Sequence, residues 1–197
     1  ESCTRMRVIL ASASPRRREL LSLLLDEFDC CSADIDETPI SDELPEDYVL
    51  RMAVEKASAV KNERGIIIGS DTVVVLSGNI LQKPVSVEDA RGMLSALSGQ
   101  THQVMTAVAI MIDAELMTII STTEVTFSTL EMPLIEAYLA TDEPWDKAGS
   151  YGIQGIAGSF VRRIDGSYSS VVGLPLYETR ALLEGAGVRT RMAGKHA

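Results

Sequence analysis

Residues 8–21 constrain the fold of this chain more than any other stretch. Val8, Ile9, Leu10 and Ala11 form an apolar run that is typical of a buried strand. A turn of small residues follows, and Ser14 then suits a helix N-cap. A proline comes next, and it suits the first helical position because its missing N–H would be unpaired there. The segment therefore predicts a strand, a tight turn and a helix in immediate succession.

The first turn of this predicted helix carries three arginines, Arg16, Arg17 and Arg18. A helix N-terminus is the positive end of the helix dipole, so each cation there costs a few tenths of a kcal/mol, roughly. A bound polyanion removes this conflict, because free backbone N–H groups, a serine hydroxyl and guanidinium groups together make a phosphate site. The alternative interpretation is a basic turn exposed to solvent.

The composition narrows the class of protein. The chain has 197 residues, which fits one domain or a domain with a small lobe, and 46% of them are hydrophobic. The net charge of -10 and the 5% of aromatic residues argue against nucleic-acid binding and against a membrane surface. No apolar run reaches transmembrane length, and no signal peptide precedes the first strand. The cysteines Cys3, Cys30 and Cys31 suggest no disulfide framework, so we expect a cytoplasmic protein.

The chain divides simply along its length. The first methionine is Met6, so residues 1–6 are interpreted as a lead. Residues 7–184 are expected to form a single domain, and the Gly- and Arg-rich residues 185–197 are expected to fray. His102 and His196 are too few and too far apart to predict a zinc site.

The expected elements alternate along the chain. Helices are expected from Pro45 and from Ser86, where Asp89 completes a capping box. A hairpin turn is expected over residues 77–79. The other expected strands are residues 28–33, 66–69, 73–76, 102–112, 116–127, 160–164 and 171–172, and the other expected helices are residues 130–140 and 176–184.

Acidic side chains supply two candidate sites. Asp34, Asp36 and Glu37 stand close together in an acidic loop, which could hold a hard cation such as Mg²⁺ or form a solvated turn. Asp71 lies between two apolar runs, where a carboxylate is costly to bury unless it is paired or bound to a metal. The ends of core strands are also where α/β sheets place their sites, so Asp71 is the best single candidate for chemistry.

Other polar positions stand out by their context. Lys56 lies on or beside the apolar stripe of its predicted helix, so it either extends its stem along the core or points at an anion. The glycine-rich loop over residues 142–158 contains Gln154, whose amide both donates and accepts hydrogen bonds. Long loops of this kind are more often functional than not, and such an amide suits the edge of a nucleobase.

Seven segments in one register resemble the signatures of the Maf family. They span nearly the whole chain and comprise residues 11–21, 55–57, 69–74, 82–84, 97–106, 146–155 and 172–176. The resemblance implies an α/β (α+β) fold of the Maf and inosine-triphosphate-pyrophosphatase type, with a mixed, elongated sheet in two lobes and a central cleft. It also implies a nucleoside triphosphate pyrophosphatase that depends on a divalent metal, Mg²⁺ or Mn²⁺, and releases a monophosphate and pyrophosphate.

Three positions separate the substrate branches of the family. The branch that resembles dTTP/UTP pyrophosphatases has Arg, Thr and Gln where the 7-methyl-GTP branch has Trp, Gln and Glu. Here the positions are occupied by Arg16, Thr72 and Gln154, so all three match the dTTP/UTP branch. A neutral amide suits the alternating acceptors and donor of uracil and thymine, whereas a positively charged methylated guanine suits a carboxylate and an aromatic face.

The resemblance also implies roles for further residues. The side chains expected to hold the triphosphate are Ser12, Arg16, Arg17, Lys56 and Lys83. Glu37 and Asp71 would position the metal, directly or through water, and Asp71 would also take the proton of the attacking water. Whether Asp71 is base, ligand or both stays open. Lys147 matches a family motif as well, and the alternative for it is a tie between its loop and the structure beneath.

Two other functions stay open beside the dTTP/UTP reaction. One is 7-methyl-GTP hydrolysis, and the other is a nucleotide-sensing regulatory role in cell division, which the family's association with septum formation suggests. Glu37 and Asp71 favour hydrolysis, because two extra carboxylates beside a polyanion repel a ligand that carries no metal. The resemblance further implies a homodimer. Modified pyrimidine nucleotides, removed in a house-cleaning role, are a further substrate class.

Overall fold

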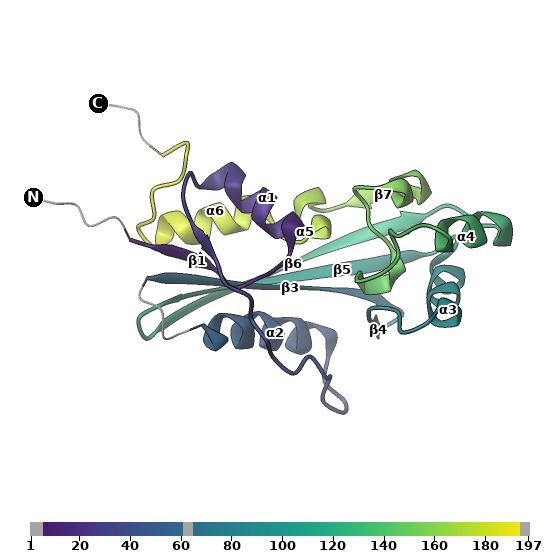
Figure 1. Cartoon of the computed structure of the whole chain (residues 1–197), viewed down its shortest axis with the longest axis horizontal. Helices are drawn as coiled ribbons and strands as arrows, with labels where there is room; N and C mark the ends of the chain where they lie inside the picture. Colours follow the sequence, from purple (N-terminus) through teal and green to yellow (C-terminus); the bar gives the residue numbers. More distant parts are fainter. Residues whose placement is uncertain (1–5, 61–64, 194–197) are drawn as a thin grey trace, which may run out of the picture. The chain divides into compact units, whose positions relative to one another are not determined.

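The computed structural model describes residues 6–60 and 65–193, so Cys3, His196 and all but one residue of the expected lead lie outside the described part (Figure 1). The elements follow one another as β1 (Val8–Leu10), α1 (Pro15–Leu24), β2 (Asp29–Cys30), α2 (Pro45–Ala59), β3 (Ile66–Leu76), β4 (Asn79–Leu81), α3 (Val87–Leu97), β5 (Thr101–Ile112), β6 (Glu115–Phe127), α4 (Met132–Leu139), the 3₁₀ turns η1 (Ala148–Ser150) and η2 (Ile156–Phe160), β7 (Val161–Asp165), α5 (Tyr168–Val172) and α6 (Leu176–Gly185). Among these residues no helix is both long enough and apolar enough to cross a membrane.

A mixed sheet of seven strands forms the framework. Its order is β2-β1-β3-β5-β6-β7, and β4 pairs with β3 beside this path. β1 runs parallel to both β2 and β3, whereas β4 and β7 run antiparallel to β3 and β6. This mixed pairing confirms the fold class that the family resemblance implies.

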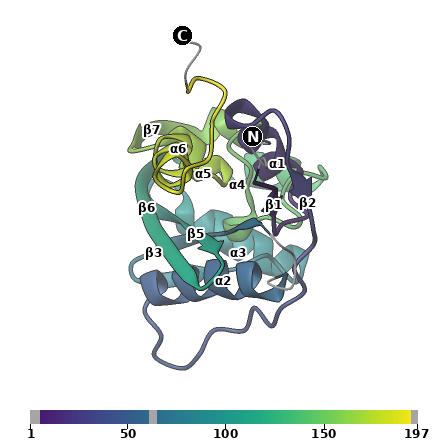
Figure 2. The ribbon, with the colours of Figure 1, turned by 90° about the vertical axis from the view of Figure 1, so that its left-hand side faces the viewer.

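The chain forms two compact units. The first contains residues up to Asp71, Thr106–Ser121 and the residues from Gly173 onward. In this unit α1 and α6 lie together on one face of the sheet, and α2 covers the other face (Figures 1 and 2). On the α1 and α6 face, Leu10, Leu21 and Leu183 are wholly buried in one core. On the α2 face a smaller core contains Ala57 and Ile67.

The second unit contains Thr72–Met105 and Thr122–Val172. Its core is a large cluster in which the aromatic rings of Phe127, Tyr138, Tyr151 and Phe160 meet edge to face. Such aromatic pairs contribute about 1 kcal/mol each beyond the area they bury. The helices α3 and α4 pack beside each other in this unit.

The helix starts follow the capping chemistry of the sequence. Ser14 caps α1 by accepting the N–H of Arg17 at 3.4 Å, with Pro15 in the first helical position, as predicted. Ser86 caps α3 by accepting the N–H of Asp89 at 3.0 Å. The Asp89 carboxylate in return accepts the N–H of Val85 rather than that of Ser86, so the predicted capping box closes one residue earlier.

Three strand predictions were wrong in detail. The strand expected over residues 28–33 is reduced to the two residues of β2. Residues 171–172 end the short helix α5, because the Ser167 hydroxyl and carbonyl accept the N–H groups of Ser170 and Val171 and start a helical turn. The two runs on either side of Asp71 form one continuous strand, β3, so Asp71 lies within a strand and not beyond its end.

The segment after α6 is bonded to the first unit as far as the structure describes it. The N–H of Arg191 donates to the carbonyl of Leu24 at 2.8 Å, and its side chain pairs with Asp26. Thr190 is buried and donates to Glu184. Fraying of residues 185–197 stays a prediction, and residues 194–197 lie outside the described part.

Candidate functional site

The turn between β1 and α1 is built by its own serines. The buried Ser12 hydroxyl accepts the N–H of Ser14 at 3.1 Å, which leaves its proton available to a ligand. Ser14 then caps the helix, and no acidic residue stands in the first turn of α1. The three arginines of that turn, Arg16, Arg17 and Arg18, therefore meet the positive end of the helix dipole without a counter-charge from their own turn, as the sequence predicts.

Arg17 is fixed in place by a backbone carbonyl of the first unit. Its Nε donates to the carbonyl of Gly173 at 2.8 Å, and the buried Ser70 hydroxyl donates to the same carbonyl at 3.2 Å. Burial lowers the pKa of the Arg17 guanidinium, the charges of Asp71 and Glu37 oppose that fall, and Arg16 adds to it. The charges of Asp71, Glu37 and Arg16 therefore lie close enough to Arg17 to affect its guanidinium.

Lys56 joins the two predicted carboxylates. Its Nζ lies 2.8 Å from Oδ1 of Asp71 and 2.9 Å from Oε1 of Glu37. The Lys56 and Asp71 side chains are only 12% and 13% exposed, whereas that of Glu37 is 44% exposed. Of the two alternatives for Lys56, the ammonium pointing at an anion is confirmed. A carboxylate within a core strand needs a partner of opposite charge, and the Lys56 ammonium is that partner for Asp71.

Gly69 explains how helix and strand come this close. A Cβ at this position of β3 would lie 2.1 Å from the carbonyl oxygen of Ala53 and 2.8 Å from the backbone nitrogen of Ala57, both on α2. Real Cβ atoms essentially never approach backbone atoms so closely. The absent side chain lets α2 rest directly on β3, which brings Lys56 of the helix within reach of Asp71, two residues further along the strand.

The remaining predicted residues belong to the second unit. Thr72 follows Asp71 and is half-buried, while Lys83 and Gln154 are exposed. The structure therefore groups Ser12, Arg16, Arg17, Glu37, Lys56 and Asp71 in the first unit, and Thr72, Lys83 and Gln154 in the second.

The loop that carries Gln154 is held by Glu143. The Glu143 carboxylate accepts the N–H groups of Ile156 at 2.6 Å and Ala157 at 3.0 Å. Desolvation raises the pKa of Glu143, but these two bonds and one with Tyr138 outweigh it, so the pKa lies below its ordinary value. A Cβ on Gly155 would lie 1.6 Å from the same carboxylate, so the glycine leaves the space that the carboxylate fills.

Lys147 stabilises this loop from inside. Its Nζ donates to the backbone carbonyl of Glu143 at 2.8 Å, and its stem lies where a side chain on Gly152 would be. Of the two interpretations of Lys147, the structural tie has this direct contact in its favour. The loop is further anchored by a hydrogen bond of 2.7 Å between the Tyr151 hydroxyl and Nε2 of His102, both buried.

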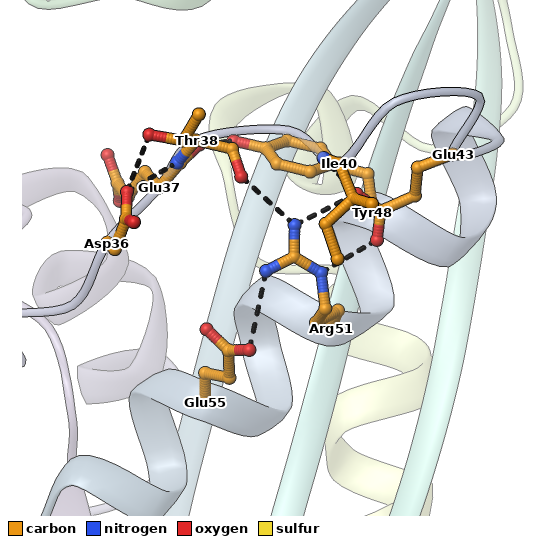
Figure 3. A network of polar contacts seen from close by, with 8 residues as sticks. All are labelled: Asp36, Glu37, Thr38, Ile40, Glu43, Tyr48, Arg51 and Glu55. Atoms are coloured by element: carbon orange, nitrogen blue, oxygen red, sulfur yellow. Dashed lines mark hydrogen bonds and ion pairs between the residues drawn. The ribbon is translucent and has the colours of Figure 1, made fainter.

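Sequence reasoning missed a second group on α2. Arg51 forms a two-pronged ion pair with Glu43, and the Tyr48 hydroxyl donates to the backbone carbonyl of Glu37 at 2.6 Å (Figure 3). Burial, together with the charges of Asp71 and Glu37, raises the pKa of Tyr48 to about 12. The signal available in sequence was weak: Tyr48 and Arg51 are three residues apart on one helix face, but their partners lie in an irregular loop.

Comparison with known sequences assigns the family. A sequence model described as Maf-like protein matches residues 7–186, which is most of the chain. The chain belongs to the Maf family. The seven segments that suggested the resemblance therefore lie within a match of nearly full length.

Relatives within the Maf family are closely similar. The dTTP/UTP pyrophosphatase of Colwellia psychrerythraea is 54% identical over 191 residues, which cover 93% of this chain and 90% of the relative. That of Hahella chejuensis is 49% identical over 190 residues, with 94% of each chain covered. That of Vibrio parahaemolyticus is 49% identical over 180 residues, with 90% of this chain and 95% of the relative covered.

A solved structure supports the fold of this Maf chain. The Ham1 protein of Staphylococcus aureus matches with a TM-score of 0.55, covering 91% of this chain and 99% of that chain, at 15% sequence identity. This likeness concerns the fold alone. It agrees with the mixed α/β fold that the Maf resemblance implies.

The carboxylates of this Maf chain fit one kind of metal site. Mg²⁺ is usually held by one or two protein carboxylates, with waters and substrate phosphates as its other ligands. Glu37 and Asp71 each pair with the same ammonium through one oxygen, so the two carboxylates, each with a second oxygen, lie near one another. Over residues 6–60 and 65–193, no group of three or more acidic, His or Cys side chains could hold a metal ion. The donor set therefore suits a cation shared with a phosphate, and not a cage made of protein alone.

Proposed function

We propose that this protein is a nucleoside triphosphate pyrophosphatase that hydrolyses dTTP and UTP to the monophosphate and pyrophosphate. The observation that carries the proposal is the Asp71 carboxylate, held 2.8 Å from Lys56 in the charge cluster that includes Arg17 of the cationic helix start. A polyanionic substrate offsets those cations, and a carboxylate among them can act on water. The relatives named dTTP/UTP pyrophosphatase support the choice of substrate.

In the proposed reaction, water attacks the α-phosphorus and the bond to the oxygen that bridges the α- and β-phosphates breaks. The pyrophosphate leaves with that bridging oxygen. Oδ1 of Asp71 is held by Lys56, so the proposal assigns the proton of the attacking water to Oδ2. Phosphoryl chemistry of this kind depends mainly on positioning and charge, because a triphosphate carries about four negative charges.

The cationic residues hold the triphosphate in this proposal. Arg17 presents a guanidinium whose Nε is already fixed on Gly173, so its terminal nitrogens lose little freedom on binding phosphate. Ser12, Arg16, Lys56 and Lys83 complete the proposed set, and a divalent cation, Mg²⁺ or Mn²⁺, would be held by Glu37 and Asp71. When bound, that cation supplies charge neutralisation and a more acidic water.

The proposal assigns recognition of the nucleobase to the three specificity positions. Gln154 is exposed in a loop that Glu143 and the Tyr151–His102 bond hold, so its amide can be presented to a uracil or thymine edge. Arg16 and Thr72 are the other two specificity positions. A cytoplasmic location and a homodimer remain part of the proposal; Cys30 and Cys31 are free and exposed, which a reducing compartment permits.

Product analysis tests this proposal. The protein would be incubated with dTTP, UTP, CTP, GTP and 7-methyl-GTP, with Mg²⁺, with Mn²⁺ or with a chelator, and pyrophosphate would be separated from orthophosphate. We expect pyrophosphate from dTTP and UTP, and only with metal. Turnover chiefly of 7-methyl-GTP would overturn the roles of Arg16, Thr72 and Gln154. Tight binding without any product would favour the nucleotide-sensing function instead.

A further inference from the structure

Glu37 occupies an irregular loop although its position is critical to the proposed site. Residues 31–44 contain neither strand nor helix, and most of them are exposed. Fixing each residue of such a loop has a cost in backbone conformational entropy. Yet the Glu37 carboxylate lies 2.9 Å from Lys56. Contacts beyond this single ion pair must therefore hold the loop.

Arg51 provides most of those contacts from the face of α2 (Figure 3). Its Nε and Nη2 donate to the two carboxylate oxygens of Glu43 at 2.7 and 2.8 Å. Nη2 also donates to the carbonyl of Thr38 at 3.2 Å, and Nη1 reaches Glu55 at 3.3 Å. One guanidinium thus bonds to both ends of the segment from Thr38 to Glu43 and to its own helix. The hydrogen bonds from Arg51 lower the pKa of Glu43 to about 2.

We call Arg51 and Glu43, with Tyr48, the clamp. Tyr48 connects it to Glu37 itself. Its ring lies under the guanidinium, with Cζ of Arg51 5.6 Å from the ring centre. Its hydroxyl donates to the backbone carbonyl of Glu37 at 2.6 Å, and the residue is only 5% exposed. Arg51, Glu43 and Tyr48 therefore hold the loop backbone at Thr38, Ile40 and Glu37. The contacts thus include Glu37 itself and the residue next to it.

We propose that Arg51, with Glu43 and Tyr48, is a positioning residue that fixes the Glu37 carboxylate beside Lys56 and Asp71. The inference rests on the proposed function, because it gives Glu37 its role in holding the substrate-bound cation. Arg51 does not touch the reacting atoms in this account. Its effect passes through the backbone of residues 37–43 to one carboxylate.

The substitution Arg51→Lys tests the clamp. A lysine keeps the charge near Glu43, but it cannot donate to Glu43, Glu55 and Thr38 together. Partners behind a metal ligand typically change metal affinity by about 10- to 100-fold when removed. We expect half-saturation with Mg²⁺ to rise about 10-fold in pyrophosphate release from dTTP, while kcat at saturating Mg²⁺ changes by less than about 3-fold. Tyr48→Phe should move the same quantity in the same direction.

A matched control comes from the second unit. Arg91 makes a two-pronged pair with Glu136 in which both side chains are more exposed than in the Arg51–Glu43 pair, so Arg91→Lys weakens an ion pair of the same chemistry elsewhere. It should leave both the Mg²⁺ dependence and kcat unchanged. Amide hydrogen exchange of residues 37–43 in the metal-free protein gives a readout that does not need activity, and it should become faster in Arg51→Lys and not in Arg91→Lys.

A double-mutant cycle with Glu37→Gln decides between positioning and mere stability. If Arg51 acts through Glu37, then Arg51→Lys adds no further loss of Mg²⁺ affinity once Glu37 is Gln. Additive losses, or unchanged hydrogen exchange in the loop, would overturn the inference while leaving the enzyme proposal intact. Failure of the unaltered protein to release pyrophosphate from any nucleotide would instead overturn the function on which it rests.

Discussion

Asp71 combines a proposed reactive role with a constrained position. Its carboxylate is 13% exposed and shares its cation, Lys56, with the more exposed Glu37. The Lys56 ammonium pairs with both carboxylates, so its positive charge offsets the repulsion between their negative charges. The same arrangement means that any change at Asp71 alters the electrostatics of its neighbours as well as its own chemistry.

The substitution Asp71→Asn should separate catalysis from binding. The amide oxygen can still accept the bond from Lys56, so the fold should persist with a loss of about 1 kcal/mol of stability. It is a poor proton acceptor, so kcat for dTTP should fall about 10³-fold. Equilibrium binding of dTTP in the presence of a chelator, where no metal contributes, should change by less than about 3-fold. Steady-state kinetics and calorimetric titration measure the two quantities.

The exposed Asp165 provides the comparison for this variant, because it pairs with Arg163 on β7 in the second unit. Asp165→Asn should leave both kcat and affinity unaltered. Near-normal turnover in Asp71→Asn would remove Asp71 from the role of base.

At the scale of elements, Gly69 sets the distance between α2 and β3. Gly69→Ala places a methyl group 2.1 Å from a backbone oxygen that cannot move without displacing the helix. We expect a loss of about 3 kcal/mol in the free energy of unfolding, measured by urea denaturation. Because α2 carries Lys56, activity should fall even in the folded fraction.

The control for this substitution is Gly92→Ala on α3, where an added Cβ would meet nothing within 4 Å. Alanine is a better helix former than glycine, so this variant should gain up to about 1 kcal/mol. Equal stability of the two variants would contradict the close packing of α2 on β3.

The loop of Gln154 is the second element with a sharp requirement. Gly155→Ala would push the Glu143 carboxylate away from the N–H groups of Ile156 and Ala157. Losing these two charge-assisted bonds should cost about 2 kcal/mol locally. Hydrogen exchange at Ile156 and Ala157 should become faster, and under the proposed function the preference for UTP over CTP should fall.

Gly185→Ala serves as the reference for that prediction, since a Cβ at Gly185 would meet nothing within 4 Å. Unchanged exchange at Ile156 and Ala157 in Gly155→Ala would show that Glu143 does not hold the loop.

Local chemistry explains which elements were predictable from sequence. Ser14 with Pro15 and Ser86 with Asp89 specify helix starts through bonds over three residues or fewer, and both starts were confirmed. The strand expected at residues 171–172 was wrong because β-branched residues favour a strand, whereas the bonds from Ser167 start a helical turn there.

At the scale of the whole molecule, the contacts that shape the site join distant residues. Lys56 and Asp71 are separated by 15 residues, and His102 and Tyr151 by 49. The sequence could nominate Asp71 because a carboxylate inside an apolar run needs a partner, but it could not name that partner. The roles of Tyr48 and Arg51 stayed hidden for the same reason, since their partners lie in a loop without periodic pattern.

His102 should make the stability of the protein depend on pH. Burial lowers its pKa to about 4, from the value of 6.5 that is ordinary for a histidine in an unfolded chain. The unfolded state therefore binds the proton more readily, and the folded state loses stability as pH falls from about 6.5 to about 4. The full difference corresponds to about 3 kcal/mol. Thermal unfolding between about pH 7 and about pH 4.5 should show this loss.

His102→Gln isolates this contribution, because glutamine does not titrate and can still bond to the Tyr151 hydroxyl. The variant should lose less stability than the unaltered protein over the same pH range. Parallel pH profiles for the two proteins would contradict a buried neutral histidine at this position.

The way in which Glu143 shapes its loop also bears on how substrate preference can be inherited. The Glu143 carboxylate, the Lys147 ammonium and the Tyr138 hydroxyl all make their bonds to residues of one short, uninterrupted stretch of the chain. Exchange of this stretch between two related genes would therefore transfer the loop together with these three supporting side chains, while His102, which bonds to Tyr151, would stay behind. Under the proposed function, divergence toward a different nucleobase would then need, beyond this one exchange, changes only at Arg16 and Thr72, and no series of compensating mutations inside the loop.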